Sequence, residues 1–510
     1  MKQLFRQRNL ILTGFIALKF ILQYILINPE YELHRDEFLH LDQAHHPAWG
    51  YRSVPPLTSL FSGLIFLLGG GVFWVKFFPA LFGALTMLIV WKCIEQLKGN
   101  LFALCLGATG VLISALLRLN MLYQPNSFDV LCWTGLYFMI ISYFNTENRK
   151  WLYYAAIIFA LGFLNKYNII FLLAGLFPAI LLGKERKLFL KTDFYFSVLL
   201  GLLLIFPNLL WQYKNDFPFF AHMKELAETQ LVNVNRLDFL KDQILFFTGS
   251  IFTIIAGLIA LRIYEPYRKF RFLFWSMLFT LSIFIVLKAK AYYAIGLYPI
   301  YIALGAVYLG HLLRTNRLKY LRVFALAVPA LFFFPLYKLA FPNRSPEYIV
   351  QNPKRYQETG QLRWEDGKNH ALPQDYADML GWKELAQKTD SLHSLVPDTE
   401  QTLVLCDNYG QAGAINYYTK RGLRAVSFNA DYLYWFDLEQ SYSNLIRIKE
   451  FDEIETELKT SSSYFNKSSL ADSITNQYAR EYRTRIYVFS GARIDINKRI
   501  QNEIKRVKKY

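Results

Sequence analysis

Long runs of apolar residues, separated by short polar connections, dominate the first two thirds of the chain. Such runs are typical of membrane-spanning helices, which need ~20 mostly apolar residues to cross a bilayer. About eleven segments come near this length. Their predicted limits are 9–28, 72–94, 101–117, 128–144, 151–164, 169–182, 194–211, 244–263, 270–287, 292–313 and 320–339. The pattern therefore predicts a polytopic α-helical membrane protein.

A polar segment interrupts this pattern directly after the first predicted span. Residues 31–60 read YELHRDEFLHLDQAHHPAWGYRSVPPLTSL, with carboxylates at Asp36, Glu37 and Asp42. Carboxylates beside a membrane are costly unless they face water, a cation or a substrate. The loop 29–71 is therefore the first place to expect catalytic residues.

Basic residues in the connections between spans predict the orientation of the chain. The N-terminus carries Lys2, Arg6 and Arg8, and the basic connections that follow are 148–150, 184–187, 262–271 and 314–322. The positive-inside rule places these segments in the cytoplasm. The segments then expected outside are the loop 29–71, residues 118–129, 165–168, 213–242 and 288–292, and the whole tail after Lys338.

The composition changes at about Asn343, where charged and polar residues rise and strand-like runs alternate with helix-like ones. This predicts a transmembrane domain over 1–342 and an extracytoplasmic α/β domain over 343–510. Expected strands are 402–406, 424–428 and 485–490. Residues 406–414, CDNYGQAGA, predict a strand, a glycine turn and a helix. A close-packed junction explains this motif better than a phosphate-binding turn, because the full G-x-G-x-x-G spacing is missing.

The net charge of +17 does not indicate nucleic-acid binding. Much of the excess lies in short loops between spans, where topology and anionic headgroups account for it. Three of the four cysteines lie in or near spans and only Cys406 lies in the tail, so neither a disulfide framework nor a zinc ribbon is expected.

Cations on the outer side are the exceptions to the positive-inside pattern. Arg118 lies between the third and fourth spans, Lys166 after the fifth, and Lys288 and Lys290 before the tenth. A shared site for an anion explains several such cations better than snorkelling to headgroups does. A sugar on a polyprenyl phosphate fits this inventory, because its phosphate leaving group needs cations while the acceptor hydroxyl needs one carboxylate as base.

Five motifs in order on the outer side resemble those of a known family. They are AWGYRSVPPLTSL after the acidic pair, QPNSFDVLCW, GFLNKYN, PNLLWQ and AYYAIGLYP. Together they resemble the bacterial branch of the C-type fold glycosyltransferases, the protein O-mannosyltransferase-like family 39 group that includes the lipid A aminoarabinose transferases. The resemblance covers roughly residues 5 to 340. It extends to the tail through LPQDYADMLGW at 372–382 and NYGQAGAI at 408–415.

The resemblance implies an inverting glycosyltransferase of the bacterial cytoplasmic membrane that uses a polyprenyl-phosphate sugar donor and a lipid, protein or glycan acceptor. It implies that Asp36 is the catalytic base, with Glu37 beside it, and that Leu57 to Gly69 lie along the membrane. Many relatives have aspartate after the proline of the second motif, whereas Asn126 follows Pro125 here. The expected substrate-binding residues are Tyr51, Arg52, Arg118, Asp129, Lys166, Lys288, Lys290, Tyr292 and Tyr293. Asp129 either orients the acceptor or caps the next helix.

Several alternatives stay open at this point. His34, His40, His45 and His46 could bind a divalent metal ion with Asp36 or Asp42, although no ligand spacing is diagnostic and the resemblance implies no cofactor. An oligosaccharide transferase or polymerase would differ only in donor size. A secondary transporter is less favoured, because the spans are nearly free of charge. A sensor or assembly protein would not require the acidic loop.

Overall fold

The computed structural model describes residues 2–314, 316–451 and 456–509. In this part of the chain six helices are long and apolar enough to span a membrane. They are α1 (Lys2–Ile25), α4 (Val72–Gln96), α7 (Asn126–Thr146), α10 (Thr192–Lys214), α15 (Tyr298–Leu312) with the preceding η5 (Ala291–Leu297), and α16 (Leu321–Ala340) with η6 (Asn316–Tyr320). Shorter apolar helices fill the other predicted spans: α5 (Leu101–Leu112), α8 (Lys150–Asn165), α9 (Ile169–Leu181), α13 (Ile251–Ile263) and α14 (Phe272–Val286). Helices form here because lipid offers no partners to the backbone.

The predicted span at 244–263 starts too early. A short helix, α12 (Arg236–Leu245), ends inside it, and α13 begins only at Ile251. The turn between them packs tightly against α16, since a Cβ on Gly249 would lie 2.7 Å from the Cα of Pro329. The apolar run does not reveal this break, because residues 244–247, at and just after the end of α12, continue the apolar pattern of α13, although the start of α12 is charged.

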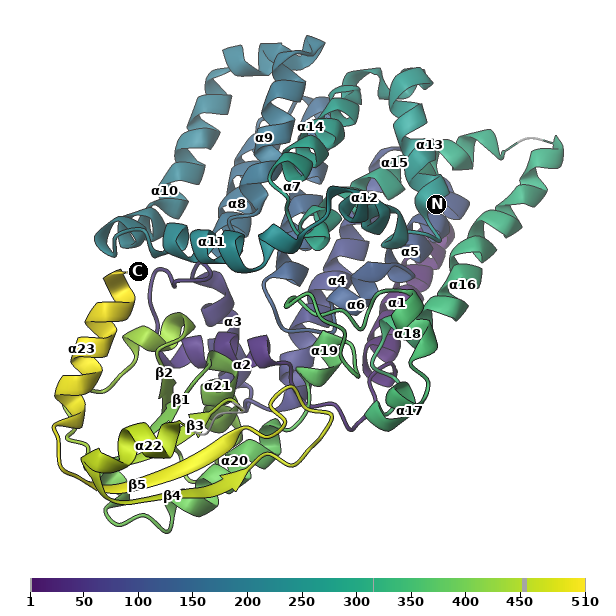
Figure 1. Cartoon of the computed structure of the whole chain (residues 1–510). Coiled ribbons are helices and arrows are strands. Elements are labelled where there is room, and N and C mark those ends of the chain that lie inside the picture. The colour runs from purple at the N-terminus through teal and green to yellow at the C-terminus, as the bar shows by residue number, and fades with distance from the viewer. Residues whose placement is uncertain (1, 315, 452–455, 510) are drawn as a thin grey trace.

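Short helices collect where the bundle meets the C-terminal domain (Figure 1). They include α2 (Arg35–Asp42), α3 (Leu57–Leu67), α6 (Ala115–Leu119) and α11 (Pro218–Thr229). The 11 residues of α3 rise only about 16 Å, too little to cross a bilayer. Its Leu60, Leu64 and Leu67 are exposed while Ser59 and Ser62 are buried. This arrangement fits a helix that lies along a membrane surface.

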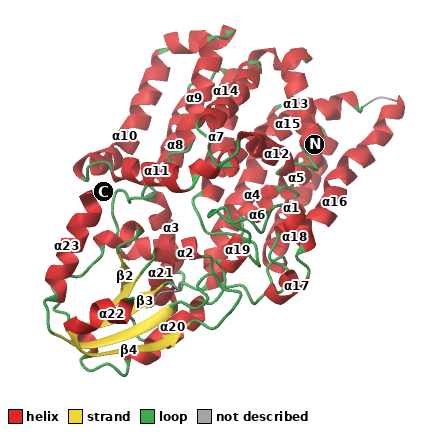
Figure 2. Cartoon of the chain, viewed as in Figure 1, coloured by secondary structure: helices red, strands yellow, loops and turns green. Residues whose placement is uncertain are grey.

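The sheet is confined to the C-terminal domain (Figure 2). Its strand order is β2-β1-β3-β5-β4. The strands are β1 (Thr402–Cys406), β2 (Ala425–Ser427), β3 (Asn444–Lys449), β4 (Phe465–Ser473) and β5 (Arg485–Ala492). The first three pair in parallel, whereas β5 is antiparallel to both β3 and β4. The predicted strands 402–406, 424–428 and 485–490 correspond to β1, β2 and β5.

The first external loop packs on the C-terminal domain and shares its core. Phe38 of α2 makes ring contacts with Trp382 of α20 (Trp382–His393) and with Tyr417 of α21 (Tyr409–Tyr418). The two helices approach so closely that a Cβ on Gly413 would lie 2.7 Å from the Cβ of Phe38. Glycine is therefore needed at this contact, and α2 is held between the bundle and the domain.

Candidate active site

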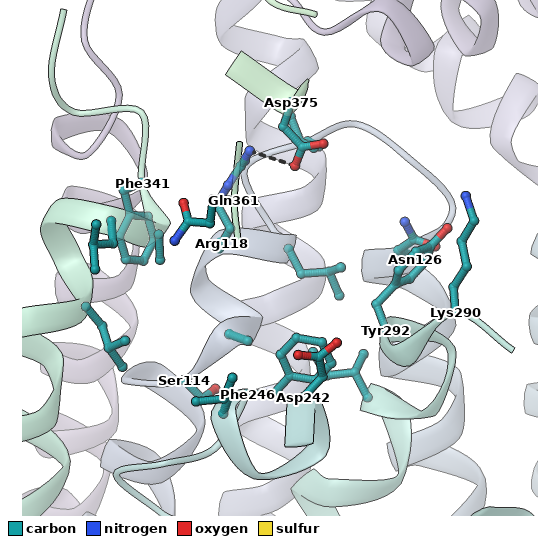
Figure 3. Close-up of a pocket in the computed structure, with 18 of the residues that line it drawn as sticks. Ser114, Arg118, Asn126, Asp242, Phe246, Lys290, Tyr292, Phe341, Gln361 and Asp375 are labelled. Atoms are coloured by element: carbon teal, nitrogen blue, oxygen red, sulfur yellow. Dashed lines mark hydrogen bonds and ion pairs between the residues drawn. The ribbon is translucent and has the colours of Figure 1, made fainter. Parts of the chain in front are cut away.

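A cavity of about 690 Å³ lies between the helix bundle and the C-terminal domain. One wall is polar and includes Asp36, Arg118, Asn126, Lys290 and Tyr409. Another part of the lining is mainly apolar and includes Ile113, Leu119, Leu245, Phe246 and several residues of α16, with Asp242 among them. Figure 3 shows Arg118 across the cavity from Lys290 and Tyr292, with Ser114 and Phe246 at its other end. The volume and the mixed lining are typical of a ligand site.

The Asp36 carboxylate accepts a hydrogen bond on each of its two oxygens. It lies in the first turn of α2, and its side chain is 34% exposed. Its Oδ1 accepts a 2.6 Å hydrogen bond from the Tyr409 hydroxyl, and its Oδ2 accepts a 2.9 Å bond from Nε2 of Gln124. Two donors from different parts of the chain thus fix the orientation of this carboxylate.

The bond from Gln124 is the last in a chain of donors. Lys166 Nζ donates to Asn126 Oδ1 over 2.7 Å, and Asn126 Nδ2 donates to Gln124 Oε1 over 2.9 Å. Because Asn126 both accepts and donates, it passes the polarisation from the ammonium group to Asp36. An aspartate at this position would lack the amide donor.

The surroundings of Asp36 favour its ionised form. Burial raises the pKa of this carboxyl, but His34, Arg35 and the Tyr409 hydroxyl outweigh burial and lower its pKa to about 2. An ionised carboxylate that is open to a cavity can accept a proton from a substrate hydroxyl.

Glu37 has a different environment from its neighbour. It is fully buried, and its carboxylate accepts hydrogen bonds from Lys76 Nζ, from the Tyr123 backbone N–H and from the His34 backbone N–H. The bond to His34 completes a capping box at the start of α2. Glu37 is absent from the described lining of the cavity. The geometry therefore indicates that Glu37 stabilises the start of α2, which leaves Asp36 as the candidate base.

Two of the predicted outer cations line the cavity. Arg118 pairs with Asp375 over 3.2 Å, and Lys290 pairs with Glu365 over 2.7 Å. Their side chains are 16% and 20% exposed. The buried Nη1 of Arg118 has no hydrogen-bond partner among the described residues. These two are the predicted cations placed to meet an anion in the cavity, whose lining also includes Arg35.

Lys166 and the paired tyrosines form the layer behind this wall. The ammonium of Lys166 lies 5.2 Å from the ring centre of Tyr292 and 4.5 Å from that of Tyr293. Of these three residues, only Tyr292 lines the cavity. Asp129 lies deeper, where it accepts hydrogen bonds from Trp133 Nε1 and Asn168 Nδ2. Pro125 is the N-cap residue of α7, so Asp129 does not cap this helix, and it does not reach the described cavity lining; its role toward the acceptor stays a prediction.

Three predicted binding residues lie away from the described cavity lining: Tyr51, Arg52 and Lys288. The guanidinium of Arg52 pairs with Glu225 of α11, and its backbone N–H donates to Asp431 of the C-terminal domain. The Tyr51 hydroxyl donates to backbone carbonyls of its own loop. The loop after α2 turns toward the C-terminal domain. Tyr51 and Arg52 are therefore close to Asp36 in sequence without sharing the cavity with it.

The four histidines of the first loop do not converge. His34 caps α2, His40 contacts Gln43, His45 packs on Phe66 and His46 stacks on Trp435. Among the described residues, no group of three histidine, cysteine or acidic side chains is arranged to hold a metal ion.

The main residues that sequence reasoning missed come from the C-terminal domain. Tyr409, Glu365 and Asp375 all line the cavity. The motif at 406–414 is a close-packed junction, as predicted, and a Cβ on Gly410 would meet Arg35 and Trp382 at 3.2 Å. The motif was conspicuous in the sequence, but nothing in it indicated contact with a loop more than 370 residues earlier.

Residues 53–211 match the family described as dolichyl-phosphate-mannose-protein mannosyltransferase. The matched segment begins after Asp36. A search of curated proteins found no match. Among solved structures, ArnT from Cupriavidus metallidurans bound to undecaprenyl phosphate is similar with a TM-score of 0.62 and 12% identity, over 93% of this chain and 97% of ArnT. The chain has the C-type glycosyltransferase fold.

Two further structures share this C-type fold. The apo form of the same ArnT gives a TM-score of 0.61 at 12% identity, over 93% of this chain and 97% of ArnT. The archaeal oligosaccharyltransferase AglB from Archaeoglobus fulgidus, in complex with an inhibitory peptide and a dolichol-phosphate, gives 0.51 at 14% identity, over 89% of this chain and 70% of AglB. The predicted C-type glycosyltransferase fold is thus confirmed.

Proposed function

We propose that this C-type fold protein is an inverting glycosyltransferase that moves a sugar from a polyprenyl-phosphate donor to an acceptor hydroxyl. The observation that carries the proposal is the cavity at the outer end of the bundle. It brings together an ionised carboxylate at Asp36, cations at Arg118 and Lys290, and an apolar wall along α16. The solved ArnT and AglB structures contain undecaprenyl phosphate and dolichol-phosphate, which are ligands of this class.

Each part of the donor has a matching part of the cavity. Arg118 and Lys290 face the phosphate, where charge grows as the sugar leaves. The apolar wall formed by Pro329, Phe333 and Leu336 of α16 suits a prenyl chain. Few residues of this helix are buried within the bundle, so its other side is open to lipid. A lipid-linked donor can therefore enter sideways from the membrane.

The reaction is a single displacement. The oxygen of the acceptor hydroxyl attacks the anomeric carbon while Asp36 takes the proton from that hydroxyl. The bond from the anomeric carbon to the phosphate oxygen breaks in the same step. The electron pair leaves with the polyprenyl phosphate, which Arg118 and Lys290 stabilise. Attack opposite the leaving group inverts the anomeric configuration. The proposal includes no metal ion and no general acid.

The site favours an enzyme over a transporter, because the cavity carboxylate and cations gather at the outer end of the bundle. The alternative is an oligosaccharide donor, and the similarity to the oligosaccharyltransferase AglB supports this alternative. We place the reaction at the outer face of the bacterial cytoplasmic membrane, with a lipid, protein or glycan as acceptor. Transfer of radiolabelled monosaccharide from polyprenyl phosphate to membrane extracts separates the two donor classes.

The test of the proposal is Asp36→Asn, which keeps the size of the side chain and removes its basicity. Turnover of a labelled polyprenyl-phosphate sugar should fall by about 10² to 10⁴, while donor binding persists. Because the pKa of Asp36 lies near 2, the carboxylate stays ionised down to about pH 4, and a loss of activity above that pH has another cause.

Glu37→Gln is the matched comparison. It leaves Lys76 buried without its carboxylate, so it should reduce the yield of folded protein more than the turnover of the folded fraction. Near-normal transfer by folded Asp36→Asn, or retention of configuration in the product, would exclude the mechanism.

A further inference from the structure

A tyrosine of the C-terminal domain contacts the carboxylate on which the proposed reaction depends. Tyr409 is the first residue of α21, it lines the cavity, and its hydroxyl lies 2.6 Å from Oδ1 of Asp36. We infer that Tyr409 is a positioning residue for the catalytic base, so that the C-terminal domain completes the active site. The inference rests on the proposed function and gives the domain a part in it.

The hydroxyl of Tyr409 is the donor in this contact. Burial and the neighbouring Asp36 raise the pKa of Tyr409 well above its usual value, although Arg35 opposes them, so the phenol keeps its proton. A short bond from a hydroxyl to a carboxylate is among the stronger hydrogen bonds in proteins. With Gln124 on Oδ2 and Tyr409 on Oδ1, rotation of the carboxylate breaks at least one of them.

The ring of Tyr409 is itself held in place by α2. The guanidinium of Arg35, the residue before Asp36, lies 4.6 Å from the centre of the Tyr409 ring and makes a cation–π contact with it. The next residue, Gly410, packs against the Cβ of Arg35 and the Trp382 ring, each 3.2 Å from where a Cβ on the glycine would lie. The start of α21 therefore cannot slide along α2 without losing these contacts.

A buried polar network anchors the start of α21 within the domain. Asn408 caps the helix by accepting from the Gln411 backbone N–H, and its amide donates to Glu450 and Glu481 over 2.7 Å and 3.0 Å. The Gln411 amide donates to Glu481 over 2.6 Å. Because Glu481 lies at the start of the segment leading into β5, the sheet supports the position of Tyr409.

The chemical consequence is a base with a fixed orientation. A general base must be held within hydrogen-bond reach of the hydroxyl from which it takes the proton. Asp36 is in the first turn of a helix of 8 residues, and one of its two orienting donors comes from another domain. Loss of the Tyr409 hydroxyl should therefore affect the chemical step and leave donor binding by the cations intact.

The experiment compares Tyr409→Phe with Tyr417→Phe in the full-length enzyme. Both residues lie on α21 and face the first loop, but the Tyr417 hydroxyl donates to the carbonyl of Gly70 and does not touch Asp36. Tyr409→Phe should lower kcat by about 10- to 100-fold with donor KM changed less than about twofold. Tyr417→Phe should leave kcat near the wild-type value. Equal effects of the two substitutions would overturn the inference.

A double variant separates positioning from a merely structural contribution. If Tyr409 acts through Asp36, removing its hydroxyl in an Asp36→Asn background should cause no further loss of kcat. A loss that adds in full to that of Asp36→Asn would contradict the inference. The single variants keep the two proposals apart. A normal Asp36→Asn enzyme rejects the proposed base, whereas an impaired Asp36→Asn with a normal Tyr409→Phe rejects the role of Tyr409 alone.

Discussion

Asp36 and Glu37 are adjacent in sequence and face different surroundings. Successive side chains of an α-helix point about 100° apart, so one neighbour can face a cavity while the other faces the core. Asp36 has an exposed edge in the cavity, whereas Glu37 is enclosed by Lys76, the Tyr123 backbone and the start of α2. The pair therefore divides into one carboxylate for chemistry and one for holding the helix.

Asn126 provides a test at this scale, because it passes the hydrogen bond from Lys166 to Gln124. Asn126→Asp can still accept from Lys166 but cannot donate to Gln124, so Gln124 loses the partner that orients it. We expect kcat to fall by about two- to tenfold, the effect of one neutral hydrogen bond, with little change in donor KM. Gln124→Ala should cause a similar loss. An Asn126→Asp enzyme as fast as wild type would show that the chain is not required.

At the scale of elements, the segment 359–378 covers the cations of the cavity. Glu365 and Asp375 of this segment pair with Lys290 and Arg118, and the two carboxylates are 45% and 58% exposed. Ion pairs this exposed are weak, about 0.2–1 kcal/mol each. A donor phosphate that binds the nitrogens of these ion pairs must replace the carboxylates, so we expect the segment to compete with the donor.

Neutralising this segment should therefore tighten donor binding. In Glu365→Gln/Asp375→Asn both cations keep a hydrogen-bond acceptor but lose the competing charge, and donor KM should fall by about two- to fivefold. Asp366→Asn is the control, because Asp366 bonds to His370 within the same segment and not to a cavity cation. If donor KM rises in the double variant while Asp366→Asn is unchanged, the carboxylates orient the cations for the donor and do not compete with it.

At the scale of the whole molecule, the C-terminal domain lies opposite the basic loops. In Figure 1 the domain is at the bottom, the loop from α9 to α10 is at the top, and α16 begins at the upper right. The positive-inside rule then predicts that the cavity and the domain share the outer side. The packing of α2 between the bundle and the domain requires the same arrangement.

Cysteine labelling of intact cells tests this orientation. Ser463→Cys in the domain should react with an impermeant reagent, and Asn148→Cys between α7 and α8 should react only after permeabilisation; both positions are exposed. Of the four native cysteines only Cys105 is partly exposed, so a Cys105→Ser background removes the main interference. Labelling of Asn148→Cys in intact cells would show the opposite orientation, with the proposed site on the cytoplasmic side.

The sequence alone determined the membrane-spanning architecture, because lipid forces long apolar runs into helices whatever their neighbours are. Every predicted span contains a helix, and the error at 244–263 lies where the apolar end of α12 runs into α13 across a short turn. The sequence also predicted β1, β2 and β5. It did not indicate β3, although NLIRIK alternates between buried and partly exposed positions, or β4, whose exposed polar residues on the sheet edge lack apolar alternation.

For the candidate site, sequence reasoning identified Asp36, Arg118 and Lys290 as chemical types on the outer side. Only the tertiary structure decided which of them share a cavity. Arg52 turned toward Asp431 and Glu225, whereas Tyr409 came to Asp36 from a separate domain. Composition and periodicity depend on the local chain, and these contacts depend on how α2 packs against α21. Hydrogen bonds between residues hundreds of positions apart leave no local pattern from which a single sequence can predict them.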